Sequence, residues 1–255
     1  MVGRDNMHNY EYLQHCVDSV DEAVEKIAHL SDQQCKNAEF LQHELIPSLG
    51  LNGENPHELP VELQRFYNKG LHIYQYPNQL AGYMIWLLHN AKSVKNLTEI
   101  GCRWGGTFIL INEWLKKIGA PIEFSVAIDP ITPSPLIERY QQISTTPVHY
   151  LQNDSHSKEV IDRMSAFKPD MVFIDGDHSL NSVMADHDMV KFQADIIVHH
   201  DVFSSSCPDT TSFWQDVKQE ESNFEAFEFV QQYESVQGHY LGIGVLKRRL
   251  TTVDR

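Results

Sequence analysis

The stretch DMVFIDGDHSLNSVMADHDMVKFQADIIVHHD, residues 170–201, decides the fold class. It contains two short apolar runs rich in Val, Ile and Phe, 170–176 and 194–201, separated by a segment of helical length. Parallel strands need a crossover between them, and that crossover is usually a helix, so this pattern predicts a strand–helix–strand unit. Both runs include an aspartate at or near their end, which places two carboxylates at one edge of the predicted sheet.

The pattern repeats on both sides of this unit. Three apolar runs precede it, at 96–101, 123–129 and 148–154, and helix-length segments separate them. Two more runs follow, at 226–233 and 240–248, joined by the hairpin-sized stretch ESVQGH, which predicts that the final strand is antiparallel to its neighbour. We expect an α/β fold: a Rossmann-like, seven-stranded, mostly parallel sheet with a terminal antiparallel strand.

The first part of the chain has another pattern. Apolar residues recur at three- and four-residue spacing over 10–46, which predicts a helix, whereas the turn-rich stretch 48–60 predicts a loop. A further buried helix is expected after Pro77. We therefore predict an N-terminal helical segment, 1–69, that serves as a lid or a dimerisation segment, followed by the α/β domain, 70–255.

Composition and charge limit the classes of partner that this protein is expected to bind. The formal charge of −15 repels phosphate backbones, so nucleic acid is a disfavoured partner. No apolar run reaches the roughly 18 residues that span a bilayer, and the N-terminus lacks the apolar core of a signal peptide, so we expect no membrane partner and a cytoplasmic location. Four cysteines lack CxxC spacing, which predicts free thiols that pack rather than a disulfide framework or a zinc site: Cys16, Cys35, Cys102 and Cys207.

The first strand ends in a glycine-rich turn, EIGCRWGGT, residues 99–107. Ligands of open α/β sheets bind beyond the carboxyl ends of the strands. Gly101 and Gly105 let the backbone turn tightly and approach such a ligand, and Glu99 lies beside them. The spacing is neither that of a dinucleotide-binding turn nor that of a P-loop, which disfavours a dehydrogenase and excludes a P-loop nucleotide site.

The next two strands end in acids that suit an adenosine-containing cofactor. Asp129 could accept hydrogen bonds from both ribose hydroxyls. Asp154, with Ser155 beside it, could receive the exocyclic amine of adenine. For Asp129 and for the Asp154–Ser155 pair, the alternative role is capping of the following helix.

The fourth and fifth strands end in Asp175 and Asp201. If these strands are neighbours, about 4.8 Å apart, the two carboxylates could share a divalent cation. Oxygen ligands favour Mg²⁺ or Mn²⁺, and His200 as a third ligand would tilt the preference toward Mn²⁺, Fe²⁺ or Zn²⁺. His178, in the loop after Asp175, could remove a proton from a hydroxyl near neutral pH. Capping, loop hydrogen bonds or plain packing are the alternative roles of these side chains.

The assembled motifs resemble a known group of enzymes. GLHIYQYPNQL (70–80), TEIGCRWGGTF (98–108), FIDGDHS (173–179) and HHDV (199–202), followed by Phe213–Trp214, are similar to the metal-dependent methyltransferases related to the cephalosporin hydroxylase and macrocin O-methyltransferase families. The resemblance covers roughly residues 70–248.

This resemblance implies a class I, S-adenosylmethionine (SAM)-dependent O-methyltransferase domain over 70–255, acting on a hydroxyl of a sugar, a glycoside or a natural product, in an enzyme that could form a homo-oligomer. It further implies that Asp175 and Asp201 bind the metal and that His178 is the general base. Gly101, Gly105 and Asp129 match its cofactor-binding positions. Relatives commonly carry Glu where this chain has His200.

Two alternatives remain open. A SAM-binding regulatory or scaffold protein without catalysis would explain the departure at His200. A metal-dependent oxygenase needs two histidines and a carboxylate in one facial triad. His199, His200 and Asp201 are consecutive in the chain, and alternate strand residues point to opposite faces, so they are poorly placed for such a triad.

Overall fold

A seven-stranded sheet with the strand order β3-β2-β1-β4-β5-β7-β6 forms the centre of the computed structural model, which describes residues 11–249. The strands are β1 (Asn96–Ile100), β2 (Phe124–Asp129), β3 (Val148–Gln152), β4 (Met171–Ile174), β5 (Ile196–His200), β6 (Phe224–Phe229) and β7 (Ile243–Arg248). The first five strands are mutually parallel, as the sequence predicts. Strands β4 and β5 are neighbours, which is the condition under which their terminal aspartates could share a cation.

The antiparallel strand is β7, which lies between β5 and β6 and is antiparallel to both. The predicted antiparallel pairing of the last strand is confirmed. The connection from β6 to β7 runs over residues 230–242 and is longer than the hairpin-sized link that the sequence suggests. Because β6 and β7 are adjacent and antiparallel, a short turn could also join them, so the strand order does not require the length of this connection.

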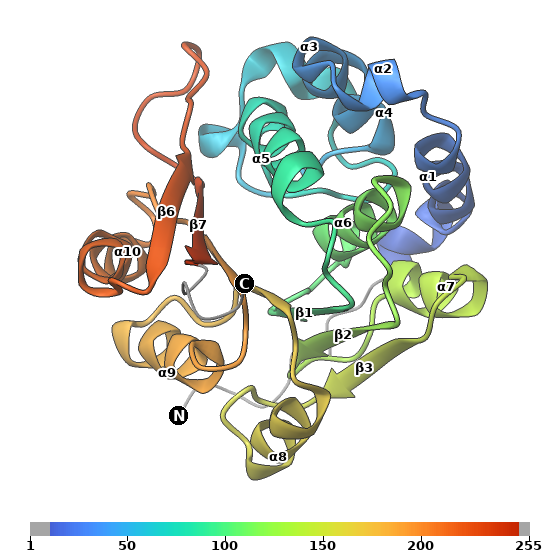
Figure 1. The fold of residues 1–255 in the computed structure, drawn as a ribbon. Coiled ribbons are helices and arrows are strands. Elements are labelled where there is room, and N and C mark those ends of the chain that lie inside the picture. The colour runs from blue at the N-terminus through green and yellow to red at the C-terminus, as the bar shows by residue number, and fades with distance from the viewer. Residues whose placement is uncertain (1–10, 250–255) are drawn as a thin grey trace.

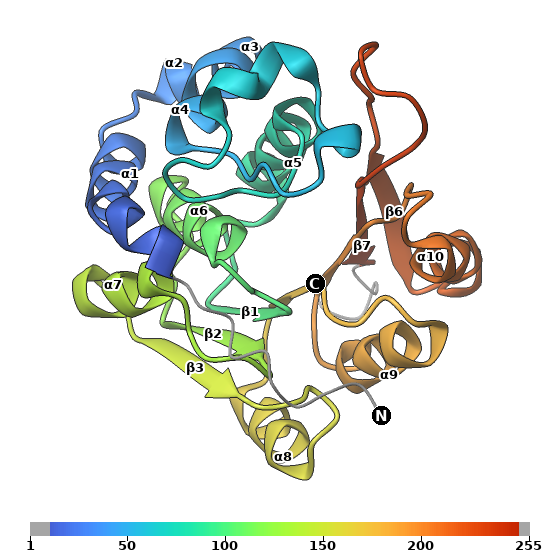
Figure 2. The ribbon, with the colours of Figure 1, turned by 180° about the vertical axis from the view of Figure 1, so that it is seen from behind.

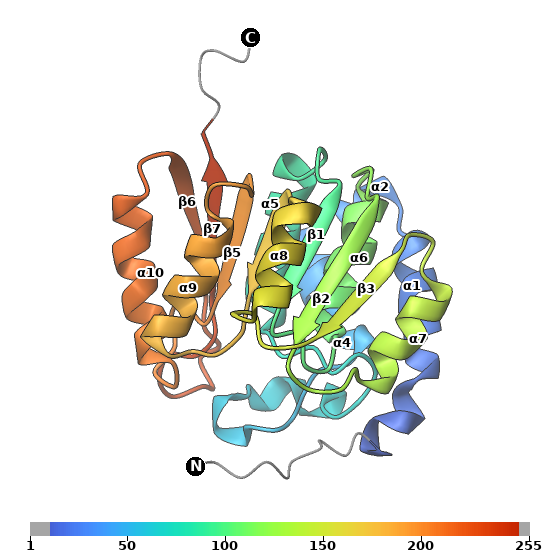
Figure 3. The same cartoon turned by 90° about the horizontal axis from the view of Figure 1, so that it is seen from below.

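Helices cover both faces of the sheet. Figures 1 and 3 show α8, α9 and α10 on one face, and α5 and α6 on the other. The bounds are α5 (Pro77–Asn90), α6 (Gly106–Lys117), α7 (Pro135–Ile143), α8 (Lys158–Phe167), α9 (Leu180–Val190) and α10 (Pro208–Glu220). Strand β4 shows why both faces need cover: Met171 and Phe173 join the apolar core under α5 and α6, and Val172 and Ile174 join the core under α8 to α10.

The N-terminal segment is a series of short helices rather than the single helix expected over 10–46. They are a 3-10 helix (Glu11–Cys16), α1 (Asp18–Ala28), α2 (Asp32–Cys35), α3 (Ala38–Phe40), a π turn (Leu41–Leu45) and α4 (Ile46–Leu49). Ser31 and Asn37 each start a new helix by accepting a backbone hydrogen bond three residues on. These side-chain hydrogen bonds end one helix and start the next. The spacing of apolar residues alone does not indicate such breaks.

The N-terminal helices pack onto the α/β part. Val20, Ile27 and Leu45 are buried in the same apolar cluster as Leu87 of α5 and Leu110 of α6. Figure 2 shows α1 beside α6 and α7, and the short helices near α5. Within the part of the chain that the structure describes, no helix is long and apolar enough to cross a membrane.

Between α4 and α5 the chain runs below the carboxyl ends of the strands, as Figure 3 shows in cyan. This segment includes two 3-10 helices, Pro56–Glu58 and Val61–Phe66. The turn-rich stretch 48–60 is largely loop, as predicted. Two ends of the predicted segments 1–69 and 70–255, residues 1–10 and 250–255, lie outside the described residues.

Candidate active site

One cavity of about 600 Å³ lies at the carboxyl ends of β1 to β5. All ten residues that the sequence singles out line it: Glu99, Gly101, Gly105, Asp129, Asp154, Ser155, Asp175, His178, His200 and Asp201. The fold therefore brings together side chains that are more than one hundred positions apart in the chain.

The glycine turn between β1 and α6 forms the floor of this cavity. Gly101 has φ +82°, and a Cβ there would lie 1.9 Å from the carbonyl oxygen of Asp175. Gly105 has φ +86°, and its Cβ would lie 2.4 Å from the side chain of Ile137. An L side chain rarely adopts this conformation, so the turn needs glycine at both positions. Without glycine, the backbone could not pass so close to the end of β4.

Asp129 is held at the end of β2 by the turn itself. Its two carboxylate oxygens accept hydrogen bonds from the backbone N–H of Arg103, at 2.8 Å, and of Ile131, at 3.2 Å. The side chain is only 6% exposed, and burial raises its pKa. Each oxygen keeps a second lone pair, so both can still accept a hydroxyl.

Glu99 is buried beside Asp129, and its Oε2 has no hydrogen-bond partner among the described residues. Burial raises the pKa of Glu99 well above its usual range, and the nearby Asp175 carboxylate adds to this effect. These two effects favour the protonated form of the carboxyl group, which can donate a hydrogen bond.

Asp154 and Ser155 lie at the rim of the cavity after β3. Asp154 is exposed, and its Oδ1 accepts the backbone N–H of His156 at 2.8 Å, a local turn contact. Ser155 donates to the buried carboxylate of Asp186. Both residues face the cavity opening, and Asp154 keeps free acceptor capacity.

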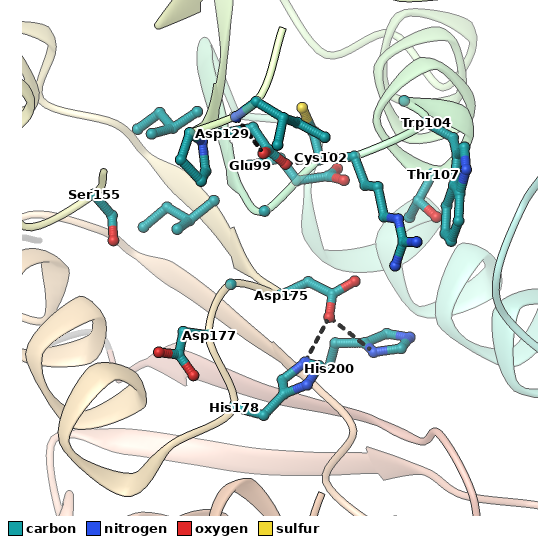
Figure 4. Close-up of a pocket in the computed structure, with 18 of the residues that line it drawn as sticks. Glu99, Cys102, Trp104, Thr107, Asp129, Ser155, Asp175, Asp177, His178 and His200 are labelled. Carbon is teal, nitrogen blue, oxygen red and sulfur yellow. Dashed lines mark hydrogen bonds and ion pairs between the residues drawn. The ribbon is translucent and has the colours of Figure 1, made fainter. Parts of the chain in front are cut away.

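The ends of β4 and β5 bring two carboxylates and two histidines together. Figure 4 shows Asp175 with His178 and His200. Asp175 Oδ1 lies 3.3 Å from His178 Nε2 and 3.2 Å from His200 Nδ1. Asp201 Oδ2 lies 3.4 Å and 3.3 Å from the same two nitrogens. Asp201 has φ +56°, a conformation that is rare outside glycine and that directs its carboxylate back toward β4.

The charges of these four groups balance one another. A hydrogen bond to Asp175, with a second to Cys207, raises the pKa of His178 to about 10. Burial opposes the charge on His200, but Asp175 and Asp201 outweigh burial and raise its pKa well above the usual range. Burial likewise opposes ionisation of Asp175, but His200 and His178 lower its pKa to about 2. The two carboxylates thus favour positive charge on the two rings, and a divalent cation would supply positive charge at the same place.

The spacing of these atoms fits ligands of one cation. Charge-assisted N–H···O bonds are usually about 2.7–2.9 Å long. Ligands about 2.1 Å from an ion, at octahedral to tetrahedral angles, lie roughly 3.0–3.4 Å apart. The four nitrogen–oxygen separations around Asp175 and Asp201 are 3.2–3.4 Å, and they match the second range. Asp175, His200 and Asp201 together could hold a metal ion.

Gln75 fixes the orientation of His200. His200 Nε2 donates to Gln75 Oε1, which leaves Nδ1 as the ring nitrogen that faces the carboxylates. Gln75 donates in turn to Gln79 Oε1, which also accepts the backbone N–H of Gly242 at 3.1 Å. His199 points to the opposite face of the sheet, where it lies 3.1 Å from His187, as strand alternation predicts.

Several residues of the site are not singled out from the sequence. Two cysteines do more than pack: Cys16 Sγ lies 3.7 Å from His72 Nε2, and Cys207, at the start of α10, contacts side chains of the site. All four cysteines are free and buried, but Cys207 Sγ lies 3.3 Å from both His178 Nδ1 and Asp201 Oδ2.

Tyr74 and Trp104 form an aromatic wall with their rings 5.9 Å apart. The position of Trp104 inside the glycine turn is the signal that could have indicated it.

Solved structures share this architecture. A crystal structure of cofactor-bound Rv0187 from MTB has a TM-score of 0.51 and 15% identity, and the match covers 93% of this chain and 91% of that one. The O-methyltransferase TomG from Streptomyces achromogenes, in complex with SAM, has a TM-score of 0.46 and 14% identity, with 92% and 99% covered. MycE methyltransferase from the mycinamycin pathway, in complex with Mg and SAH, has a TM-score of 0.44 and 13% identity, with 66% and 48% covered.

The sheet, with one antiparallel strand between β5 and β6, has the arrangement expected of class I methyltransferases. The chain has the Rossmann-like methyltransferase fold. At these identities the similarity shows the fold and nothing finer. Comparison of the sequence with protein-family models and with curated proteins found no match.

Proposed function

We propose that this protein is a SAM-dependent O-methyltransferase that acts on a hydroxyl of a small molecule with the help of a divalent cation, Mg²⁺ or Mn²⁺. One observation carries the proposal. A single cavity joins the glycine turn and Asp129 to the cluster of Asp175, His178, His200 and Asp201. A cofactor subsite and a proton-transfer subsite therefore open onto the same space, as a two-substrate transfer requires.

The cofactor subsite is the glycine turn with the acids after β2 and β3. Asp129, oriented by the N–H groups of Arg103 and Ile131, would accept the ribose hydroxyls. Asp154 and Ser155 at the rim would face the adenine. Glu99 and Gly101, deeper in the cavity, would face the methionine part of the cofactor.

The transfer subsite lies at the ends of β4 and β5. SAM supplies the methyl group, and a divalent cation supplies positive charge that stabilises the acceptor oxygen. Asp175, His200 and Asp201 would hold that cation. A cation held by Asp175, His200 and Asp201 would put positive charge beside His178 and favour its neutral form. The side chain of His178, which is 40% exposed and faces the cavity, would then take the acceptor proton at a ring nitrogen.

The acceptor is a hydroxylated small molecule, such as a sugar, a glycoside or a natural-product scaffold. Tyr74 and Trp104 place two aromatic rings, inclined at 61° to each other, in the cavity wall, and Arg103 lies over the Trp104 ring at 4.0 Å. Aromatic faces of this kind suit the ring of a small acceptor. The net charge of −15 and the narrow cavity agree with a small acceptor rather than a nucleic acid.

We infer that the segment 1–69 serves as a lid over this cavity. Tyr12 accepts a hydrogen bond from Trp104 Nε1 at 2.8 Å, and Glu54 pairs with Arg103 at 3.1 Å. Both contacts bring the N-terminal segment to the cavity wall. The alternative role, a dimerisation segment in a homo-oligomer, is tested by the solution mass of the protein.

Isothermal titration tests the proposal directly. We expect SAM to bind the purified protein at a one-to-one ratio, and Mn²⁺ to bind in a separate titration that a chelator abolishes. With a set of hydroxylated compounds, methyl transfer should stop on addition of chelator and return with excess Mg²⁺ or Mn²⁺. No binding of SAM at millimolar concentration would refute the proposal.

The alternatives predict other results. A regulatory SAM-binding protein would bind the cofactor tightly and turn over no hydroxylated compound. An oxygenase would consume oxygen in a reaction that depends on Fe²⁺. The departure at His200 motivates the first alternative, and the presence of Asp175, Asp201 and His178 in one cluster argues against it.

A further inference from the structure

A second group of metal-binding side chains lies beside the first. His178, Asp201 and Cys207 offer a nitrogen, an oxygen and a sulfur atom that lie within 4.8 Å of one another. Asp201 belongs to this group and to the group with Asp175 and His200. The sequence, which lacks CxxC spacing, gives no indication of this thiol-containing group.

We propose that His178, Asp201 and Cys207 form a second cation position, selective for a thiophilic divalent ion such as Zn²⁺, that switches methyl transfer off when it is filled. This inference rests on the proposed function only for its effect on activity. The ion binding itself follows from the side chains of the chain.

The donor set decides which ion fits. Cys207 Sγ lies 3.3 Å from Asp201 Oδ2 and 3.3 Å from His178 Nδ1, the separation of neighbouring ligands around one ion. Cys207 and Asp201 are buried. An ion bound to them would therefore replace two of its water ligands with protein atoms. Sulfur, nitrogen and carboxylate together suit Zn²⁺, whereas Mg²⁺ prefers oxygen ligands. The thiol proton leaves to solvent when the sulfur coordinates the ion.

The position of His178 gives the functional consequence. A neutral imidazole has one lone pair on nitrogen, and its other ring nitrogen carries a hydrogen. When an ion takes that lone pair, the ring cannot accept a proton from the acceptor hydroxyl. The first cation position, made by Asp175, His200 and Asp201, keeps two ligands of its own. Zinc would therefore inhibit without displacing Mg²⁺ from all of its ligands.

Cobalt titration of the full-length protein under reducing conditions tests the ion site without any assay of activity. We expect Co²⁺ to give a near-ultraviolet sulfur-to-metal charge-transfer band, and Zn²⁺ to abolish it at one equivalent. The band should be lost in Cys207→Ser and kept in Cys102→Ser, a matched control because Cys102 lines the same cavity but belongs to neither ligand group. Zinc affinity in Cys207→Ser should fall by more than the roughly 10- to 100-fold that loss of an outer-shell partner costs.

The result that overturns the proposal is equally specific. A protein without the band, or a band that Cys207→Ser retains, removes Cys207 as a ligand. If Cys207→Ser does not fold, as judged by circular dichroism, His178→Gln takes its place and must weaken Zn²⁺ binding while leaving Mn²⁺ binding in place. Failure of SAM to bind would refute the proposed function and leave the cobalt result standing, so the two failures are distinguishable.

Discussion

Asp129 illustrates how a single carboxylate can be prepared for a cofactor. Two backbone N–H groups hold it in one orientation before any ligand arrives. We expect Asp129→Asn to weaken SAM binding by about 10- to 100-fold, because the amide keeps one acceptor oxygen and loses one charge-assisted hydrogen bond to the ribose, worth about 1.5–3 kcal/mol. Isothermal titration gives the dissociation constant. Unchanged affinity in the folded variant would assign Asp129 to capping of the turn.

His178 is the proposed general base. We expect His178→Gln to lower kcat by about 10²- to 10⁴-fold, the usual contribution of a general base. The affinity for SAM should stay the same, because His178 contacts Asp175, Asp201 and Cys207 rather than the glycine turn. Steady-state kinetics and a cofactor titration on the same sample separate the two effects. An unaltered kcat would mean that another group takes the proton.

Strand-end positions make much of this site predictable from the sequence. Asp129, Asp175 and Asp201 lie where a strand meets a loop, and a parallel sheet brings such positions to one edge. Cys207 and Gln75 could not be found in this way, because each reaches the site through a loop or a segment whose path depends on tertiary packing. The roles of all these side chains remain predictions.

At the scale of the element, the turn between β1 and α6 has almost no freedom. We expect Gly101→Ala to lower the free energy of unfolding by more than the roughly 1–2 kcal/mol that a left-handed conformation costs an L residue, since its Cβ would also overlap the Asp175 carbonyl. Gly119→Ala is a matched control: its φ is +88°, but a Cβ there meets nothing within 4 Å. Urea denaturation measures both.

The two glycine variants should also differ in cofactor binding. Gly101→Ala should lose SAM affinity, because the turn would have to move away from the end of β4. Gly119→Ala, at the far end of α6, should keep it. Equal losses of stability in the two variants would contradict the close approach of the turn to β4.

Elements were predictable where hydrophobic periodicity is strong. All seven strands and the helix after Pro77 lie where the sequence places them, with ends shifted by a few residues. The breaks in the helix predicted over 10–46 arise from caps at Ser31 and Asn37, which are weak signals inside a strong periodic pattern. The length of the link before β7 was not predictable in this way, because periodicity does not indicate how many residues a loop contains.

For the whole molecule, the decisive question is whether 70–255 can fold without the N-terminal segment. Val20, Ile27 and Leu45 share a buried cluster with α5 and α6. We expect a chain truncated to residues 70–255 to expose this apolar surface and to aggregate or bind a hydrophobic dye, whereas the full chain unfolds in one transition. A soluble truncated chain that binds SAM would show that 1–69 is an independent unit.

The parallel strands and the antiparallel last strand were predictable from the sequence at this scale, but the strand order and the way the N-terminal segment covers the sheet were not. The sequence shows that residues 1–69 contain apolar helical faces. It does not show which partner buries them, because a helix face of that kind can pack within the chain or against a second copy.

The relay from His200 through Gln75 and Gln79 to the backbone of Gly242 has a consequence for metal recognition. The hydrogen bond at Nε2 restricts the orientation of the His200 ring before any ion binds. The conformational entropy of the ring is therefore lost during folding and not during ion binding. Because the protein ligands can move little, the radius and the preferred coordination number of the ion then decide which ion binds. Gly242, directly before β7, thus helps to orient His200, the proposed metal ligand at the end of β5.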